Sequence, residues 1–342
     1  MVRYILGFLF VSLLFSCQNT KAPDVSHIKA DIEIVRTENQ LSSIKSVSDL
    51  NKLMDGHKAF YRLYFSEVLS ISNANNPDSL YTGVSGFLRD SLISNLFNQV
   101  ETKFKDLSTV KVEAQQMYQY LQHYFPLQIS VPRIYTFISE YGYQAFIFQD
   151  DNGNDGIGIG LDMFLSPEID YKSINPDNTN FSSYITRTWN REHIVPKIAD
   201  LHITEIIGDA PGHKMLDQMI HNGKALYIKD LILPMIQDSL IFEYTGEQLQ
   251  WCQDNELEMW SFFLDKKLFY ESNPVKIGKY INPSPNSPDM PADSPGRTAN
   301  FIGYKIVKAF MDRYPETTLA ELIAMTDSQQ LMEKSKYKPT RK

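Results

Sequence analysis

Four histidines, with the carboxylates around them, are the side chains of this sequence best suited to bind a metal ion. They fall within twenty-nine residues: His193, His202, His213 and His221. Histidine and carboxylate together form a zinc ligand set, but a zinc-peptidase helix spaces its histidines as His-Glu-x-x-His, so that both face one metal. Here neighbouring histidines are nine, eleven and eight residues apart.

The inverted spacing His-x-x-Glu-His is approached once, at His202 and Glu205, but Ile206 stands where the second histidine is needed. The sequence therefore predicts no local metal motif. It leaves open a site assembled from distant parts of the chain, for which the candidate ligands are His202, Glu205, His213 and His221.

Other catalytic patterns are missing from the sequence. It contains no Gly-x-Ser-x-Gly elbow, no phosphate-binding glycine loop and no dinucleotide fingerprint. Cys252 lies beside Trp251 on an apolar helical stretch with Glu256 nearby, and such surroundings raise a thiol pKa. We therefore expect Cys252 in the core, assign no catalytic residue and no cofactor, and predict that the protein is not an enzyme.

An acidic turn and a buried acid are two further polar features. The turn from Asp151 to Gly156, followed by Asp162, partly matches a calcium loop, but the predicted strands on both sides favour a plain hairpin. One helical stripe is apolar at all but one position: Leu249, Cys252, Glu256, Trp260 and Phe263. A buried Glu256 needs a partner, and Arg297 and Lys224 are the candidates for a structural ion pair.

Helices supply most of the framework that must hold these residues. Apolar residues at helical spacing predict one helix from Asp49 to Val68, two more between 88 and 124, and later ones near 190–207, 213–236, 246–269, 297–313 and 318–333. Thr245 and Gln248 form a predicted capping box at the start of the helix near 246. Five prolines in 282–295 predict a surface loop.

Strands are predicted at 27–35 and, as an antiparallel sheet, between 129 and 164, where β-branched and aromatic runs alternate with glycine and asparagine. We find no internal repeat and no clear linker. The mature chain is therefore expected to be a single α+β domain over 27–342, mainly helical with a small antiparallel sheet.

Composition excludes several classes of protein. The chain has 342 residues, of which 43% are hydrophobic and 22% charged, which is globular composition. Its net charge of -8 argues against nucleic acid as a partner, because a phosphate backbone would be repelled by the average surface.

The amino terminus carries the pattern of a bacterial lipoprotein. Arg3 precedes the apolar run from Tyr4 to Ser16, which has signal-peptide length and is too short to cross a bilayer. The run ends Leu-Phe-Ser-Cys, so we expect a signal peptide over 1–16, lipidation of Cys17, and an anchor and tether over 17–26. The predicted location is the cell envelope, with the protein lipid-anchored at the outer membrane and facing the periplasm.

A fixed order of short motifs resembles the gliding motility lipoprotein GldB of the Bacteroidota. The matching segments are 219–227 (MIHNGKALY), Leu233-Pro234, Tyr244-Thr245, Trp251-Cys252, Asn255-Glu256, Ser294–Arg297 and Ile302–Val307. The resemblance implies a lipid-anchored component of the gliding apparatus and the type IX secretion system, with other proteins of that machinery as partners.

Proteins of this family also look distantly similar to a group of predicted zinc peptidases. In that register the helix near 195–207 keeps His202, while Ile198 and Ala199 take the places of the first histidine and the glutamate. The resemblance thus implies a degenerate zinc-metallopeptidase-like core without its metal and base. A metal-dependent peptidase or hydrolase with a remodelled site is the alternative function. A third reading is a sugar- or lipid-binding lipoprotein that uses its aromatic residues, among them Trp189, Trp251 and Trp260.

Overall fold

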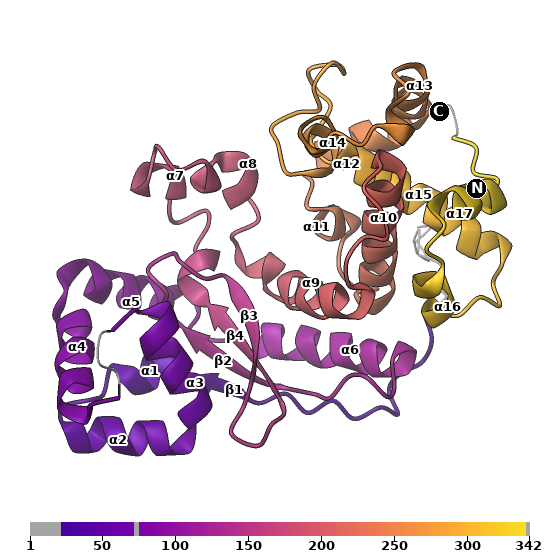
Figure 1. Ribbon diagram of the computed structural model, residues 1–342. Helices are drawn as coiled ribbons and strands as arrows, with labels where there is room; N and C mark the ends of the chain where they lie inside the picture. Colours follow the sequence, from indigo (N-terminus) through magenta and orange to yellow (C-terminus); the bar gives the residue numbers. More distant parts are fainter. Residues whose placement is uncertain (1–21, 72–74, 340–342) are drawn as a thin grey trace, which may run out of the picture.

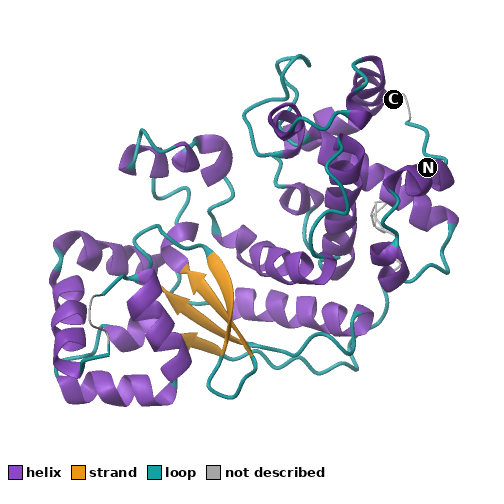
Figure 2. Ribbon diagram, in the orientation of Figure 1, coloured by secondary structure: helices purple, strands orange, loops and turns teal. Residues whose placement is uncertain are grey.

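A four-stranded sheet occupies the middle of the N-terminal part of the molecule (Figures 1 and 2). The computed structural model describes residues 22–71 and 75–339. The strands are β1 (Ile34–Arg36), β2 (Arg133–Phe137), β3 (Ala145–Gln149) and β4 (Asp155–Gly160), in the order β1-β2-β4-β3. The fold is therefore α+β and mainly helical, as predicted.

The prediction of an antiparallel sheet is wrong, because the sheet is mixed. β3 and β4 form the predicted hairpin around the acidic turn, but β1, β2 and β4 run parallel. β3 follows β2 in the sequence but does not pair with it. β4 lies between them in the sheet, parallel to β2 and antiparallel to β3. β4 fits there because Gly156 and Gly158 have no side chains. A Cβ on either would lie 2.6 or 2.5 Å from the rings of Phe148 and Phe146.

The predicted strand over 27–35 is mostly an unpaired extended segment. Only Ile34–Arg36 joins the sheet, as β1. Ala30 and Ile32 are nevertheless buried, at 5% and 2% exposure, because the segment lies against the main hydrophobic core. The alternation of apolar and polar residues over 27–35 therefore reflects burial of one side of the chain and not strand pairing.

Short helices cover one face of the sheet: α1 (Thr37–Leu41), α2 (Val47–Gly56), α3 (Lys58–Leu63), the π-helix η1 (Tyr64–Val68), α4 (Pro77–Arg89) and α5 (Ser91–Lys103). The single helix predicted from Asp49 to Val68 is broken at His57, whose backbone is not helical, with φ of -152° and ψ of 59°. Aromatic rings join this layer to the sheet, and Phe60 stacks on Tyr135 with ring centroids 4.7 Å apart.

The opposite face of the sheet packs against α6 (Ser108–Tyr124) and α9 (Ile194–Ile207), in one core with Ile134, Ile157 and Ile159. Between β4 and α9 the chain forms an arm that projects from the body (Figure 1). The arm itself carries α7 (Tyr171–Ile174), η3 (Thr179–Phe181) and α8 (Ser183–Thr186). The preceding η2 (Leu161–Phe164) lies in the main hydrophobic core, and η4 (Arg191–His193) leads into α9.

The C-terminal half is a helical bundle made of α10 (Met215–Ile232), α11 (Asp238–Phe242), α12 (Gly246–Asp254), α13 (Glu256–Asp265), η5 (Leu268–Tyr270), α14 (Pro274–Ile281), α15 (Thr298–Arg313), α16 (Leu319–Ala324) and α17 (Ser328–Ser335). Its central contact is α10 against α15. Gly223 and Gly303 allow the close approach, since a Cβ on Gly303 would lie 1.9 Å from the Met219 carbonyl oxygen.

Most of the predicted C-terminal helices are present, with two differences. The helix predicted over 246–269 is divided at Asn255 into α12 and α13, and the one over 318–333 is divided into α16 and α17. The capping box is confirmed, with the Gln248 N–H donating to the Thr245 hydroxyl at 3.1 Å. The loop predicted over 282–295 is confirmed, and it extends two residues further, to Arg297. Among the described residues, no helix has both the length and the apolar character needed to span a bilayer.

Candidate functional site

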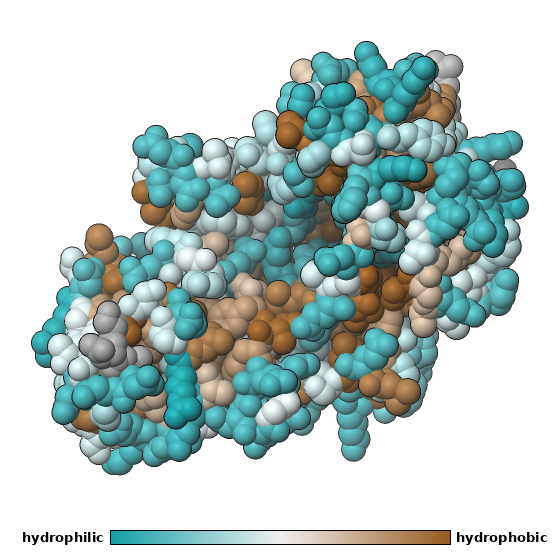
Figure 3. All heavy atoms as spheres, viewed as in Figure 1, coloured by the Kyte–Doolittle hydropathy of each residue, from teal (hydrophilic) through white to brown (hydrophobic). Residues whose placement is uncertain are grey.

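A cavity of about 520 Å³ lies where the projecting arm, the sheet and the C-terminal bundle meet. Its walls come from the β2–β3 connection, the segment from η3 to α8, the start of α9, the residue after α11 and both ends of the proline-rich loop. Figure 3 shows the surface hollowed between the α7–α8 arm and the C-terminal helices. A cavity of this volume falls in the range in which proteins hold small organic ligands.

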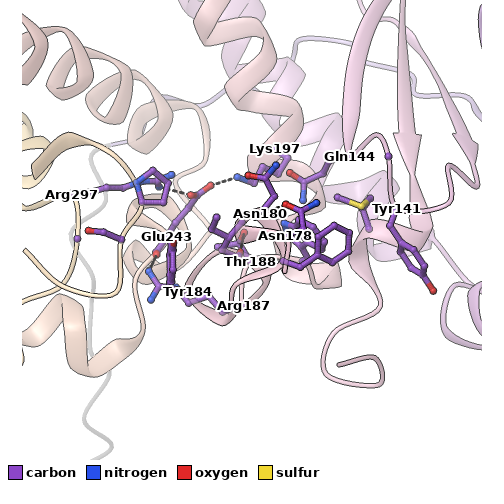
Figure 4. Close-up of a pocket in the computed structure, with 18 residues that line it drawn as sticks. Tyr141, Gln144, Asn178, Asn180, Tyr184, Arg187, Thr188, Lys197, Glu243 and Arg297 are labelled. Carbon is purple, nitrogen blue, oxygen red and sulfur yellow. Dashed lines mark hydrogen bonds and ion pairs between the residues drawn. The ribbon is translucent and has the colours of Figure 1, made fainter. Parts of the chain in front are cut away.

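Glu243 and two cations form the polar wall of this cavity. Glu243 follows α11 in a left-handed backbone conformation, with φ of 55°. Its two carboxylate oxygens form ion pairs with Lys197 of α9 and Arg297 before α15 (Figure 4). Burial alone would raise the pKa of Glu243, but the positive charges of Lys197 and Arg297 outweigh burial and hold this pKa well below its usual range.

The proline-rich loop fixes the position of Arg297. Tyr244, next to Glu243, donates a hydrogen bond from its hydroxyl to the Gly296 carbonyl oxygen at 3.0 Å. Gly296 packs so closely on Ser284 that a Cβ would lie 2.5 Å from the serine Oγ. Arg297 itself has φ of 60°, which turns the chain into α15. The helix starts at Thr298, within one residue of its predicted start.

Arg187 on the projecting arm adds a third cation to the cavity. One of its terminal nitrogens donates to the Glu243 backbone carbonyl oxygen at 2.8 Å, while its buried Nε–H has no acceptor. Gln144, on the β2–β3 connection, also has a buried side-chain nitrogen with no acceptor. Burial lowers the pKa of the Arg187 guanidinium, and the nearby charge of Arg297 lowers it further. The cavity wall thus holds three cations and one carboxylate.

Asp162 holds the turn that forms another part of the wall. Its carboxylate accepts the backbone N–H groups of Ser139 and Tyr141, at 3.0 and 2.7 Å. Burial raises the pKa of Asp162 to about 6, although these hydrogen bonds act in the opposite direction. Asp162 therefore positions Tyr141 and Gly142 at the cavity and has no part in the acidic hairpin turn that partly matched a calcium loop.

A second cavity, of about 280 Å³, lies on the other side of the same ion pairs and is also lined by Lys197, Glu243 and Arg297. There Lys229 forms an ion pair with Asp200 at 2.8 Å. The Glu243 cluster thus stands between two hollows.

The structure does not bring the four candidate metal ligands together. His202 is buried in α9, where its Nε2 lies 2.7 Å from the Tyr118 hydroxyl, and burial lowers its pKa to about 4. Glu205 and His213 are exposed, and His221 lines the second cavity. Within the described part of the chain, no group of three histidine, cysteine or acidic side chains is placed to hold a metal ion.

The partners predicted for Glu256 are wrong, although the residue is buried at 3% exposure. Its carboxylate accepts from the Tyr337 hydroxyl at 2.8 Å and pairs with Lys305 at 2.9 Å. Arg297 pairs with Glu243 instead, and Lys224 donates to the Met325 carbonyl oxygen at 2.6 Å. Lys305 lies on α15, so its pairing with Glu256 could not be predicted from the spacing of residues along α12 and α13.

Cys252 is a free, buried thiol, as predicted, and burial raises its pKa to about 12. Cys17, the predicted lipidation site, lies outside the described residues, as do the signal peptide over 1–16 and part of the tether over 17–26.

Sequence reasoning missed three residues of the cavity, Arg187, Lys197 and Glu243. Each is a lone charge in an otherwise apolar or uncharged run: Tyr-Ile-Thr-Arg-Thr-Trp, Ile-Val-Pro-Lys-Ile-Ala and Ile-Phe-Glu-Tyr. Such isolated charges are a signal of buried pairing. The signal does not say which of these charges pair, because the three runs are far apart in the chain.

Comparison with known proteins places the chain in a family. A stretch of 162 residues, 45% of the chain, is 26% identical to the uncharacterized protein YuaO of Escherichia coli and spans 8% of that protein's length. No solved structure matches the chain. The family model described as gliding motility protein GldB matches residues 18–339. This match covers nearly the whole chain, and the protein therefore belongs to the GldB family of gliding motility proteins.

Proposed function

We propose that this protein is a lipid-anchored component of the cell envelope that serves gliding motility and type IX secretion by binding other components, without catalysing a reaction. The observation that carries the proposal is the family match over residues 18–339, which supports a role in gliding motility. The partners would be proteins of the gliding and secretion machinery, and the expected site is the outer membrane facing the periplasm.

The lipid anchor rests on the sequence around Cys17. The segment Leu14-Phe15-Ser16-Cys17 matches a lipobox, and two or three acyl chains hold a protein on a membrane essentially permanently. Val25 is already buried in the body at 5% exposure. Val25 is eight residues after Cys17, so the chain between them spans at most about 29 Å. An acylated Cys17 would keep the folded body close to the membrane surface.

The non-catalytic part of the proposal rests on how the buried acids and bases are used. Glu243 is held by Lys197 and Arg297, Glu256 by Lys305 and Tyr337, and His202 lies against Tyr118. Ile198 and Ala199, which would replace a peptidase histidine and glutamate, are fully buried among apolar residues. A degenerate peptidase-like core is compatible with this arrangement, as a fold can persist without its chemistry.

Replacement of the chromosomal gene by a Cys17→Ser version tests the anchor and the motility role together. We expect the variant to leave the membrane fraction and to abolish colony spreading and secretion, as deletion of the gene would. A Cys252→Ala version is the matched control, because it removes the other cysteine and keeps the lipobox. Membrane retention of Cys17→Ser would contradict lipidation, and normal spreading and secretion after deletion of the gene would contradict the role.

Elemental analysis of the purified protein tests the absence of metal chemistry. We expect no stoichiometric zinc. Zinc bound at one ion per chain and lost in His202→Ala, at unchanged thermal stability, would favour the metallohydrolase instead.

A further inference from the structure

We propose that the cavity at Arg187, Lys197 and Arg297 binds a small anionic saccharide. The cavity lies between the arm and the C-terminal bundle. It has a volume of about 520 Å³ and is lined by the polar groups described above (Figure 4). The proposal goes beyond the motility role and does not depend on the lipid anchor.

Charge gives the first argument. Three cations and the single carboxylate of Glu243 line the cavity, which leaves a net positive wall in a protein whose net charge is -8. A concave wall with a net charge, surrounded by low-dielectric protein, attracts ligands of the opposite sign. The ligand therefore carries an acidic group.

Unsatisfied donors give the second argument. The buried Nε–H of Arg187 and the buried side-chain nitrogen of Gln144 have no acceptor within the protein. A buried donor without an acceptor costs about 1–3 kcal/mol, so such groups are kept where something else satisfies them. Both residues line the cavity, so oxygen atoms of a bound ligand would supply the acceptors once these side chains turn toward it, since neither nitrogen is exposed in this structure.

The remaining lining residues distinguish a sugar from a bare anion. The carboxamides of Gln144, Asn178 and Asn180 lie together beyond Lys197 in Figure 4. A carboxamide both donates and accepts, as a sugar hydroxyl does, whereas inorganic phosphate offers chiefly acceptors to such a wall. Phe181 and Trp189, whose rings meet edge to face at 5.4 Å, add apolar surface for the C–H face of a ring.

The ligand chemistry proposed is an acid group on a hydroxylated ring, and both a carboxylate and a phosphate ester provide such a group. Titration of the full mature chain in detergent with D-glucuronate, glucose 6-phosphate, D-glucose, inorganic phosphate and the dipeptide Gly-Glu separates these sources. Ligand-observed NMR gives each Kd. We expect glucuronate or glucose 6-phosphate to bind at least about tenfold more tightly than glucose, phosphate or the dipeptide, because a charge-assisted hydrogen bond is lost in the neutral sugar.

Two pairs of variants locate the binding. Arg187→Gln is compared with Arg191→Gln, since both guanidinium groups donate to a backbone carbonyl oxygen but Arg191 does not line the cavity. Asn180→Ala is compared with Asn175→Ala, because both side chains are exposed on the arm and only the first lines the cavity. We expect Arg187→Gln to weaken binding of the acidic sugar about tenfold or more, Asn180→Ala to weaken it severalfold, and the two controls to leave it unchanged.

Several results would overturn the proposal. Equal binding of glucose and its acidic forms would remove the role of charge, and tighter binding of Gly-Glu or inorganic phosphate would remove the sugar. Unchanged binding in both Arg187→Gln and Asn180→Ala would place the ligand elsewhere. If Arg187→Gln fails to fold, Asn180→Ala decides the location, because its exposed side chain contributes little to stability.

Discussion

Two buried carboxylates, Glu256 and Glu243, lie in the C-terminal half of the chain and differ in what surrounds them. Glu256 stands in the first turn of α13, where the helix dipole favours an acid, and its oxygens meet the hydroxyl of Tyr337 and the ammonium of Lys305. The ring of Tyr337 also packs edge to face on Trp260, at 5.2 Å. The acid, its partners and the apolar packing around them form a closed structural unit.

Glu243 has two cationic partners instead of one, and these partners also face a cavity. Arg187 and Gln144, which line the same cavity, retain buried donors without acceptors. A buried ion pair by itself indicates structure, and Glu256 is such a case. What marks the Glu243 region for binding is the excess of cations and unused donors over the acids that could neutralise them.

The largest expected effect is the loss of the Glu243 carboxylate. Glu243→Ala leaves Lys197 and Arg297 close together without a counter-charge, and removing one partner from a buried pair costs about 3–5 kcal/mol. The free energy of unfolding, from urea denaturation followed by circular dichroism, measures it. Glu247→Ala, an exposed acid four residues away, is the control. A loss for Glu243→Ala as small as that of Glu247→Ala would contradict the buried cluster.

The next effect separates the two carboxylates. Lys305→Met leaves Glu256 with Tyr337 alone and is expected to cost about 2–3 kcal/mol. Lys197→Met should cost less, because Arg297 still neutralises Glu243. Lys308→Met serves as the control, since Lys308 makes only an exposed pair with Asp312. Equal losses of unfolding free energy for Lys305→Met and Lys197→Met in the same experiment would contradict this difference, because they would show that Arg297 does not compensate for the loss of Lys197.

Acid should weaken the Glu243 cluster. Its pKa in the folded protein lies well below the ordinary value of 4.5, so the ion pairs contribute fully above about pH 4.5 and lose their contribution as the pH falls below it. The stability difference between the wild type and Glu243→Gln should therefore narrow from pH 7 to pH 3.5. Urea denaturation of both proteins at the two pH values measures the gap, and a constant gap would show that this pKa is not lowered.

The smallest effect concerns a single hydrogen bond at the closed site. Tyr337→Phe removes the hydroxyl that donates to Glu256 but leaves Lys305 and the aromatic packing, so we expect a loss of about 1–2 kcal/mol. Tyr270→Phe removes an exposed hydroxyl that donates to Gln329 and should change stability by a few tenths of a kcal/mol at most. Thermal unfolding of the two variants side by side checks this, and identical midpoints would mean that Tyr337 does not support the buried acid.

The sequence predicted those features that depend on neighbouring residues. The long helices α6, α9, α10 and α15, the capping box at Thr245, the loop over 282–295 and the burial of Cys252 and Glu256 follow from local spacing and turn chemistry, whereas the short helices α7, α8, α11 and α14 were not predicted. The helix break at His57 and the division at Asn255 were missed, because apolar spacing continues across both and neither site carries a proline.

Features that depend on distant segments were not predicted. β4 enters between β2 and β3 through a choice of strand partner, and no local pattern specifies that choice. Arg297 was placed beside the wrong carboxylate for the same reason, since Glu243 is fifty-four residues away and sits in a left-handed turn outside any helical stripe. The candidate site is therefore a product of tertiary structure, and only its isolated charges are visible in the sequence.

Colony spreading of cells that carry Arg187→Gln on the chromosome tests most directly whether the cavity beside Glu243 is needed for gliding motility. Cells with Arg191→Gln are the control, and quantitative immunoblotting confirms equal abundance of both variants in the membrane fraction. We predict that Arg187→Gln reduces spreading to the level of the gene deletion while Arg191→Gln spreads normally. Normal spreading of Arg187→Gln at normal abundance would contradict a functional role for the cavity.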